Sequence, residues 1–86
     1  LAEATIISGQ ISLSINSPSG KFKQYWCVLK PGVLSYMDKP DSKKITGFMQ
    51  LEHYDIRVLP EETFKNHPLC LEIFLPHIAS NILSFK

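Results

Sequence analysis

Hydrophobic and polar residues alternate along several short stretches of the chain. In residues 10–16 (QISLSIN), polar side chains separate Ile11, Leu13 and Ile15, a pattern typical of a strand with one face in water. Residues 22–30 (FKQYWCVLK) are rich in aromatic and β-branched side chains and predict a second strand. Further strands are expected at residues 33–37, 45–51, 54–59, 69–75 and 81–85.

Turn and loop residues separate these strands. Pro31-Gly32 predicts a tight hairpin, because Pro presets φ at the first corner and Gly accepts a positive φ at the second. Gly47 lies inside an apolar run and suggests a bulge or a bend. Loops are expected at residues 16–20, 38–44 and 60–68, the last with room for a single helical turn.

No stretch shows a persuasive 3.6-residue period, so the pattern favours an all-β domain. Strands at intervals of about ten residues, with turn signals between them, are typical of a sandwich or a barrel. Consecutive strands usually pair with each other, which favours an antiparallel meander. We therefore expect one small all-β domain over residues 1–86.

The second strand is apolar on both faces. Trp26 and Val28 share one parity with Phe22, whereas Cys27 shares the other with Leu29. We interpret Trp26 as a core residue rather than a membrane anchor, because aromatic side chains in strands usually bury. Phe22 is compatible with either role.

Composition places the chain among ordinary globular proteins. Apolar residues make up 44% and charged residues 20% of the 86 residues, and no apolar run is long enough to span a membrane. No signal peptide is visible at the start, and the initial Leu suggests a piece of a longer protein. Cys27 and Cys70 lie in apolar runs, which favours reduced, buried thiols and a cytoplasmic location.

Positive charge is concentrated in one segment. The net charge of the chain is only +1, but residues 21–44 hold six lysines against Asp38 and Asp41, a local charge of +4. Such a segment produces a local positive potential even where the total charge is near zero.

Residue patterns for catalysis or cofactor binding are lacking, so we expect no enzyme activity, no catalytic residues, no cofactor and no metal. His67 and Cys70 have no partner pair with zinc-ligand spacing, and burial of Cys70 would make its thiol inert. The four glycines are scattered and form no phosphate-binding loop, and no Ser lies in a nucleophile motif.

Lysines lie in the loop before the second expected strand and in the loop after the third. In an antiparallel meander these two loops leave the sheet at the same end, so the lysines should lie close together there. Ammonium groups gathered there would attract phosphate or an anionic membrane surface. Solvated loop lysines without a ligand are the competing interpretation. Nucleic acid is disfavoured, because the only arginine is Arg57 and the aromatic residues follow strand alternation.

Several segments together resemble the strands of a pleckstrin homology (PH) domain. They are SGQISL, KFKQYWCVLKPGVLSYM, TGFMQL and LCLEIF, in that order, over residues 8 to about 86. More narrowly, YWCVLKPGVL and LCLEIFLPHIASNILSFK are similar to the domain of oxysterol-binding-protein-related lipid-transfer proteins. The resemblance implies two near-orthogonal antiparallel sheets that form a partly open seven-stranded barrel. The family's C-terminal capping helix is absent from this chain, so the domain would be incomplete there and would expose apolar surface.

The resemblance also implies a function and its residues. Lys23 matches the first member of the basic pair that enters strand two in phosphoinositide-binding members, but Tyr25 and Leu13 occupy two other basic positions. Without an arginine fork, phosphate binding should be weak and driven by charge. The expected partners are anionic membrane lipids, at the cytoplasmic face of membranes, and the alternative is a protein-interaction module that uses a strand edge or the face of the fifth strand. The expected headgroup-binding residues are Lys21, Lys23, Lys39, Lys43 and Lys44.

Overall fold

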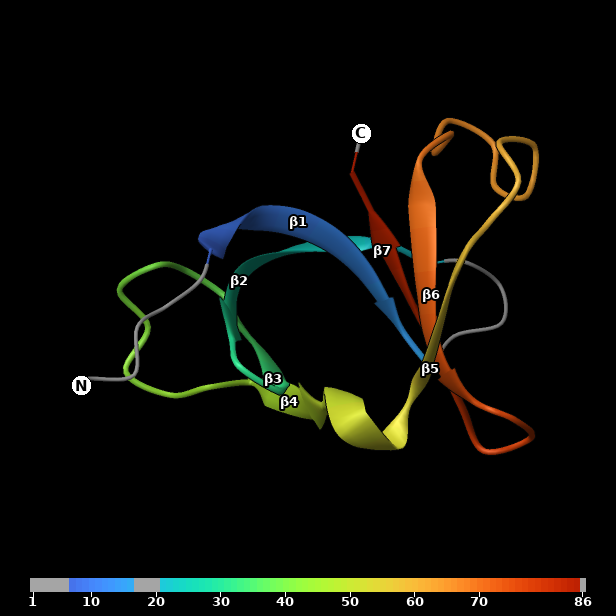
Figure 1. Ribbon diagram of the computed structural model, residues 1–86. Helices are drawn as coiled ribbons and strands as arrows, with labels where there is room; N and C mark the ends of the chain where they lie inside the picture. Colours follow the sequence, from blue (N-terminus) through green and yellow to red (C-terminus); the bar gives the residue numbers. More distant parts are fainter. Residues whose placement is uncertain (1–6, 17–20, 86) are drawn as a thin grey trace.

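The computed structural model describes residues 7–16 and 21–85, which form seven strands and one short 3-10 turn (Figure 1). The expected loop at residues 17–20 lies outside the described residues. The elements are β1 (Ile7–Ile15), β2 (Lys23–Lys30), β3 (Val33–Met37), β4 (Gly47–Gln50), η1 (Leu51–His53), β5 (Asp55–Val58), β6 (Cys70–Leu75) and β7 (Ala79–Ser84).

All seven expected strands are present, most with shifted ends. The hairpin at Pro31-Gly32 is confirmed, and Gly32 has the positive φ of 76° that this turn requires. The expectation that a helical turn could form within residues 60–68 is wrong, because that loop consists of turns and bends. A turn of 3-10 helix instead forms at Leu51–His53, where the chain passes from β4 to β5.

The strands pair in the order β4-β3-β2-β1-β7-β6-β5 and form one continuous antiparallel sheet. Residues 7–13 of β1 pair with β2, and residues 12–15 pair with β7. Figure 1 shows β1 to β4 curving round to face β5, β6 and β7, so the two expected sheets are halves of one bent sheet. The edge strands β4 and β5 do not pair with each other. The seven-stranded all-β barrel is therefore partly open, as the resemblance implied.

The core lies between the two halves of the sheet. Leu13 of β1 is 1% exposed and contacts a cluster that includes Leu34, Ile73 and Leu83. Ile11 and Ile15 pack against this cluster, as the alternation of β1 predicts. Burial of these aliphatic side chains is the main favourable contribution to the stability of so small a domain.

The assignment of Trp26 to the core is wrong. Cys27, only 2% exposed, points into the core, and Tyr25 and Leu29 on its face of β2 pack against the cluster. Trp26 has the opposite parity and lies partly buried on the outer face, in register with Met37 of β3. Since β2 is apolar on both faces, only the direction of the sheet's curvature decides which face is inside.

Gly47 is not part of a bulge. It is the first residue of β4 and pairs with Tyr36 in the regular register of the β3–β4 ladder. A Cβ atom at Gly47 would lie 2.6 Å from Cζ of Tyr36, a distance that real Cβ atoms do not show. An alanine at this position would therefore force the ring of Tyr36, which lies against β4 here, to move.

The loop between β5 and β6 covers the outer face of β6 and β7. Beneath it, Cys70, Ile82 and Ser84 are all buried, although the inner face of these strands already forms the core. Phe64 of this loop lines a small cleft together with Ile82. The face therefore carries a second, smaller apolar cluster under a long loop.

Both cysteines are free and buried, as expected for reduced core thiols. Burial raises the pKa of the Cys27 thiol from 9.0 to about 11, and burial also raises the pKa of Cys70. Neither thiol is in the ionised form needed for nucleophilic chemistry near neutral pH.

The opening of the barrel is an apolar groove of about 420 Å³. Ile7, Ile11, Ile56, Leu71 and Phe85 are among its lining residues. Because Ile7 and Ile56 are 62% and 53% exposed there, the predicted exposure of apolar surface is confirmed.

Candidate functional site

The first two lysines of the expected site lie at the start of β2. Lys21 is exposed, and Lys23 pairs in register with Leu13 of β1. Lys23 consequently has the same parity as Tyr25 and Cys27, and its ammonium group lies over the ring of Tyr25, 5.2 Å from the centroid. The side chain thus extends from the edge of the core towards solvent.

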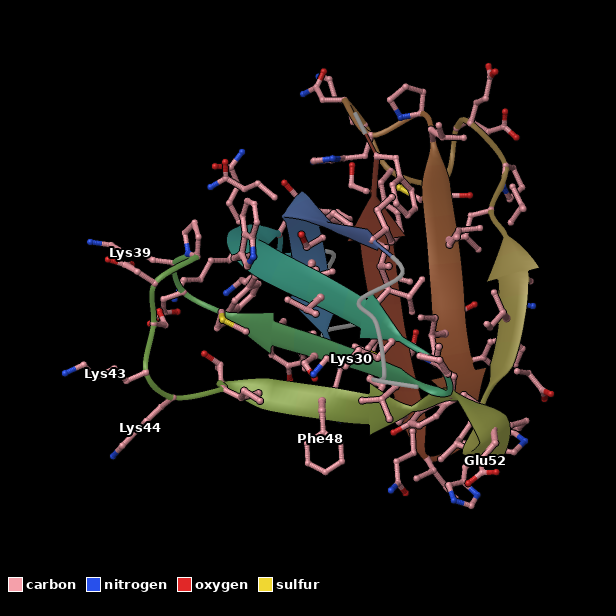
Figure 2. The ribbon with its side chains drawn as sticks, turned by 60° about the vertical axis from the view of Figure 1, so that its left-hand side comes forward. Lys30, Lys39, Lys43, Lys44, Phe48 and Glu52 are labelled. Carbon is pink, nitrogen blue, oxygen red and sulfur yellow. The ribbon has the colours of Figure 1, made fainter. Side chains whose placement is uncertain are left out.

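The other three expected lysines lie in the loop between β3 and β4. Backbone and side chain of Ser42 each form a 3.0 Å hydrogen bond with the backbone of Lys39, which closes a turn. Figure 2 shows Lys39, Lys43 and Lys44 projecting outward from this loop. No carboxylate lies within ion-pair distance of these three ammonium groups in the described part of the chain.

An ion pair joins the two lysine-bearing segments. Nζ of Lys23 lies 3.6 Å from Oδ1 of Asp38, the first residue after β3. The start of β2 and the loop after β3 therefore lie at the same end of the sheet, as the meander predicted. We refer to Lys21, Lys23, Lys39, Lys43 and Lys44 as the lysine rim.

Lys30 lies outside the lysine rim. It ends β2 beside the Pro31-Gly32 turn, and Figure 2 shows it well away from Lys39, Lys43 and Lys44, towards the other end of the hairpin. This lysine gives the chain an internal control for charge effects that do not depend on position.

Aromatic side chains line the core side of the sheet next to Lys23. Tyr25 and Tyr36 meet edge to face with ring centroids 5.1 Å apart. Burial, followed by the nearby Tyr25, Tyr54 and Cys27, raises the pKa of Tyr36 above its usual 10.0. Tyr25 occupies the position where the resemblance would place a phosphate-binding arginine, and its ring is packed against Tyr36.

Arg57, the sole arginine, is engaged elsewhere. Its Nε donates a 2.6 Å hydrogen bond to Oε1 of Glu72, and its guanidinium lies 4.7 Å from the centroid of the Phe74 ring. Glu72 is only 9% exposed, and its other oxygen accepts a 2.5 Å hydrogen bond from Oγ of Ser80. Arg57 satisfies this buried carboxylate on the β5–β6 half of the sheet.

The long loop before β6 anchors the start of β2. Phe22, between Lys21 and Lys23 in sequence, stacks on His67 with ring centroids 4.1 Å apart and meets Phe64 edge to face at 5.5 Å. Nδ1 of His67 lies 2.7 Å from Oγ of Ser84 in β7. Phe22 is thus a packing residue, and a loop from the far half of the sheet holds the lysines that flank it.

Little in the sequence indicated this anchoring contact. His67 and Phe64 lie in a polar loop, and their spacing shows no relation to Phe22, more than 40 residues earlier. An aromatic residue at the first position of a strand, before the alternation is established, was the only available signal.

Within the described ranges 7–16 and 21–85, the structure contains neither a candidate metal-ion cluster nor a candidate membrane-spanning helix. No group of three His, Cys, Asp or Glu side chains is arranged to hold a metal ion. Over the same residues, none of the helical structure has the length and apolar character needed to cross a bilayer.

The strand order and the two unjoined edges define the chain as a small, partly open β-barrel. Its sequence matches the PH domain family over residues 5–85, and the chain therefore belongs to the PH domain family. Domains of this family are generally non-catalytic modules that contact membranes or other proteins. No curated protein matches the chain significantly.

Proposed function

We propose that this chain is a non-catalytic membrane-targeting module that binds anionic phosphoinositide headgroups weakly through the lysine rim. The observation that carries the proposal is the 3.6 Å ion pair between Lys23 and Asp38, since it brings two lysine-bearing segments to one end of the sheet. Five lysines against Asp38 and Asp41 leave a formal charge of +3 in these segments. A polybasic surface of this kind is attracted to anionic lipids by about 1 kcal/mol per lysine.

The chemistry of the rim supports weak rather than tight binding. Lysine presents a point charge, whereas tight phosphate sites use the planar, bidentate fork of arginine. Asp38 also competes for Lys23, although both side chains are more than 60% exposed and the pair contributes little. We expect salt-sensitive association that strengthens when a second contact with the membrane is available.

Co-sedimentation with lipid vesicles tests the proposal. The unchanged chain should bind vesicles that contain phosphoinositide and should not bind vesicles of phosphatidylcholine alone. The double variant Lys21→Glu, Lys43→Glu should lose most of this binding, whereas Lys30→Glu should retain it, because Lys30 lies away from the rim.

Two results would contradict the proposal. Equal binding to phosphoinositide and neutral vesicles would remove its basis, and so would an equal effect of charge reversal at Lys30 and at the rim. An equal, salt-sensitive response to every anionic lipid would replace headgroup recognition with general electrostatic attraction.

A protein-interaction module is the second candidate, and the free edge of β5 favours it. All four residues of β5 are exposed, and Ile56 and Val58 are 53% and 69% exposed. An extended peptide adds to such an edge through backbone hydrogen bonds. Under this alternative, Ile56→Lys abolishes partner binding, whereas changes at the lysine rim have no effect on it.

We further propose that the chain acts in the cytoplasm, peripheral at membranes, as a domain of a larger lipid-transfer protein. The two buried free thiols support a reducing compartment, and the two segments that resemble oxysterol-binding-protein-related proteins support the parent. The parent is tested by sequencing its transcript beyond the codon for Lys86. The capping helix followed by a lipid-transfer domain is expected there, and a catalytic domain instead would contradict this assignment.

A further inference from the structure

The outer face of the β2–β4 hairpins carries apolar side chains that take no part in the core. Because Leu34 and Met49 point inward, their strand neighbours point outward, and the register aligns Phe48 of β4 with Ser35 of β3. Phe48 remains 60% exposed in this position. Figure 2 shows its ring projecting away from the sheet into solvent.

Ile45, two residues before β4, is a second exposed apolar side chain and lies between the lysines and Phe48 in the sequence. Its side chain is 56% exposed, and it directly follows Lys43 and Lys44. We call Ile45 and Phe48 the β4 apolar patch. Figure 2 shows Lys44 and Phe48 projecting on the same side of the hairpin.

Charge next to the patch distinguishes between a membrane and a protein as its occupant. Lys39, Lys43 and Lys44 have no ion-pair partner among the described residues, so their charges are available to an external anion. Protein–protein interfaces are depleted in lysine and favour larger apolar areas than two exposed side chains provide. Apolar side chains beside several lysines match the interfacial layer of an anionic bilayer, where each kind of group finds its preferred surroundings.

We propose that the β4 apolar patch inserts into the interfacial layer of an anionic bilayer while Lys39, Lys43 and Lys44 hold its headgroups. This inference rests on the proposed function and adds a docking orientation to it, with the β3–β4 hairpin directed into the membrane. Insertion also supplies the second contact that a charge-driven module with no arginine in its lysine rim needs for stable association.

Fluorescence at single introduced cysteines tests the insertion directly. The variant Phe48→Cys is labelled with nitrobenzoxadiazole, and Glu52→Cys serves as the matched control, because Glu52 follows β4 and lies beyond its far end from the lysines (Figure 2). Cys27 and Cys70 are 2% and 1% exposed, so the reagent should spare them; labelling of the unchanged chain checks this.

Each labelled chain is mixed with phosphatidylcholine vesicles, with or without phosphatidylserine and phosphoinositide. A parallel series uses the same vesicles with added lipids that carry a nitroxide quencher on the acyl chain. With anionic vesicles, the label at position 48 should brighten and shift to the blue, and nitroxide lipids in the same vesicles should quench it. The label at position 52 should show none of these three changes. Separately, Phe48→Ala should weaken vesicle binding about tenfold, because the variant lacks the phenyl ring whose transfer from water into the bilayer favours binding. Circular dichroism confirms that each variant is folded.

The outcomes separate this inference from the proposed function. Suppose that the unchanged chain binds anionic vesicles and Lys43→Glu weakens binding, but Phe48→Ala has no effect and the label at position 48 stays unquenched. The patch then does not insert, and the lysine rim alone accounts for binding. If the unchanged chain binds no anionic vesicle, both proposals are overturned.

Discussion

Substitution of Gly47 by alanine should destabilise the fold, although a glycine in a strand is ordinarily a weak point. The new Cβ atom would lie 2.6 Å from Cζ and 3.2 Å from Cε1 of Tyr36. That ring has little freedom to move away, because it is partly buried and packs edge to face on Tyr25. The clash therefore has to be relieved by moving packed groups.

The size of the effect follows from two opposing contributions. Overpacking of this kind costs about 1–3 kcal/mol. Alanine gains about 0.5–1 kcal/mol over glycine in a strand, because the unfolded chain loses less freedom on folding. We therefore expect Gly47→Ala to lower the free energy of unfolding by up to about 2.5 kcal/mol.

Gly9→Ala is the matched control. Gly9 also lies inside a regular strand, opposite Cys27, but no atom lies within 4 Å of a Cβ added there. This substitution should be neutral or stabilise the chain by up to about 1 kcal/mol. Urea unfolding followed by the fluorescence of Trp26 measures both variants by linear extrapolation.

A double-mutant cycle isolates the contact. In a Tyr36→Ala background the ring is absent, so Gly47→Ala should lose its cost and behave like Gly9→Ala. The reasoning is refuted if Gly47→Ala and Gly9→Ala have the same stability relative to the unchanged chain. It is also refuted if the cost of Gly47→Ala persists without the tyrosine ring.

Three further predictions follow from the ion pairs and the buried thiol. Arg57→Ala should lower the free energy of unfolding by about 1–3 kcal/mol in urea titrations, because it leaves buried Glu72 without its cation. Adding Glu72→Gln should recover part of this loss. No recovery in the double variant would contradict this account. Lys23→Met should change stability by less than about 0.5 kcal/mol in the same assay, because its pair with Asp38 is solvent-exposed; a loss as large as that of Arg57→Ala would show otherwise. The Cys27 thiol has a pKa of about 11 in the folded chain and near 9.0 in the unfolded chain, so the free energy of unfolding should fall as the pH rises from 9.0 towards 11. Cys27→Ala should flatten this pH dependence relative to the unchanged chain. An unaltered pH dependence would exclude the thiol as its source.

Much of the local structure was predictable because it depends on neighbouring residues. Alternation located the strands, and Pro31-Gly32 located the tightest hairpin, since their backbone preferences act within a few residues. Antiparallel pairing of consecutive strands then predicted that the start of β2 and the β3–β4 loop lie at one end, which the ion pair between Lys23 and Asp38 confirms. That these lysines bind lipid remains a prediction.

The contacts that complete the candidate site were not predictable from local pattern. Phe22 stacks on His67 only because the β5–β6 loop folds over the outer face of β7. Phe48 is exposed beside the lysines because it points away from the core on β4, an edge strand. Both features depend on which segments distant in sequence become neighbours, and alternation within a strand contains no information about that.

The sequence by itself determined the strands, the turns between them and the segment that carries the positive charge. The tertiary structure alone decided which face of β2 is buried, so that Cys27 rather than Trp26 enters the core. It also decided that β1 pairs with β7, which joins the two halves of the barrel. The physical reason is that backbone preference acts over a few residues, whereas the curvature and closure of a sheet follow from the simultaneous burial of side chains on all its strands.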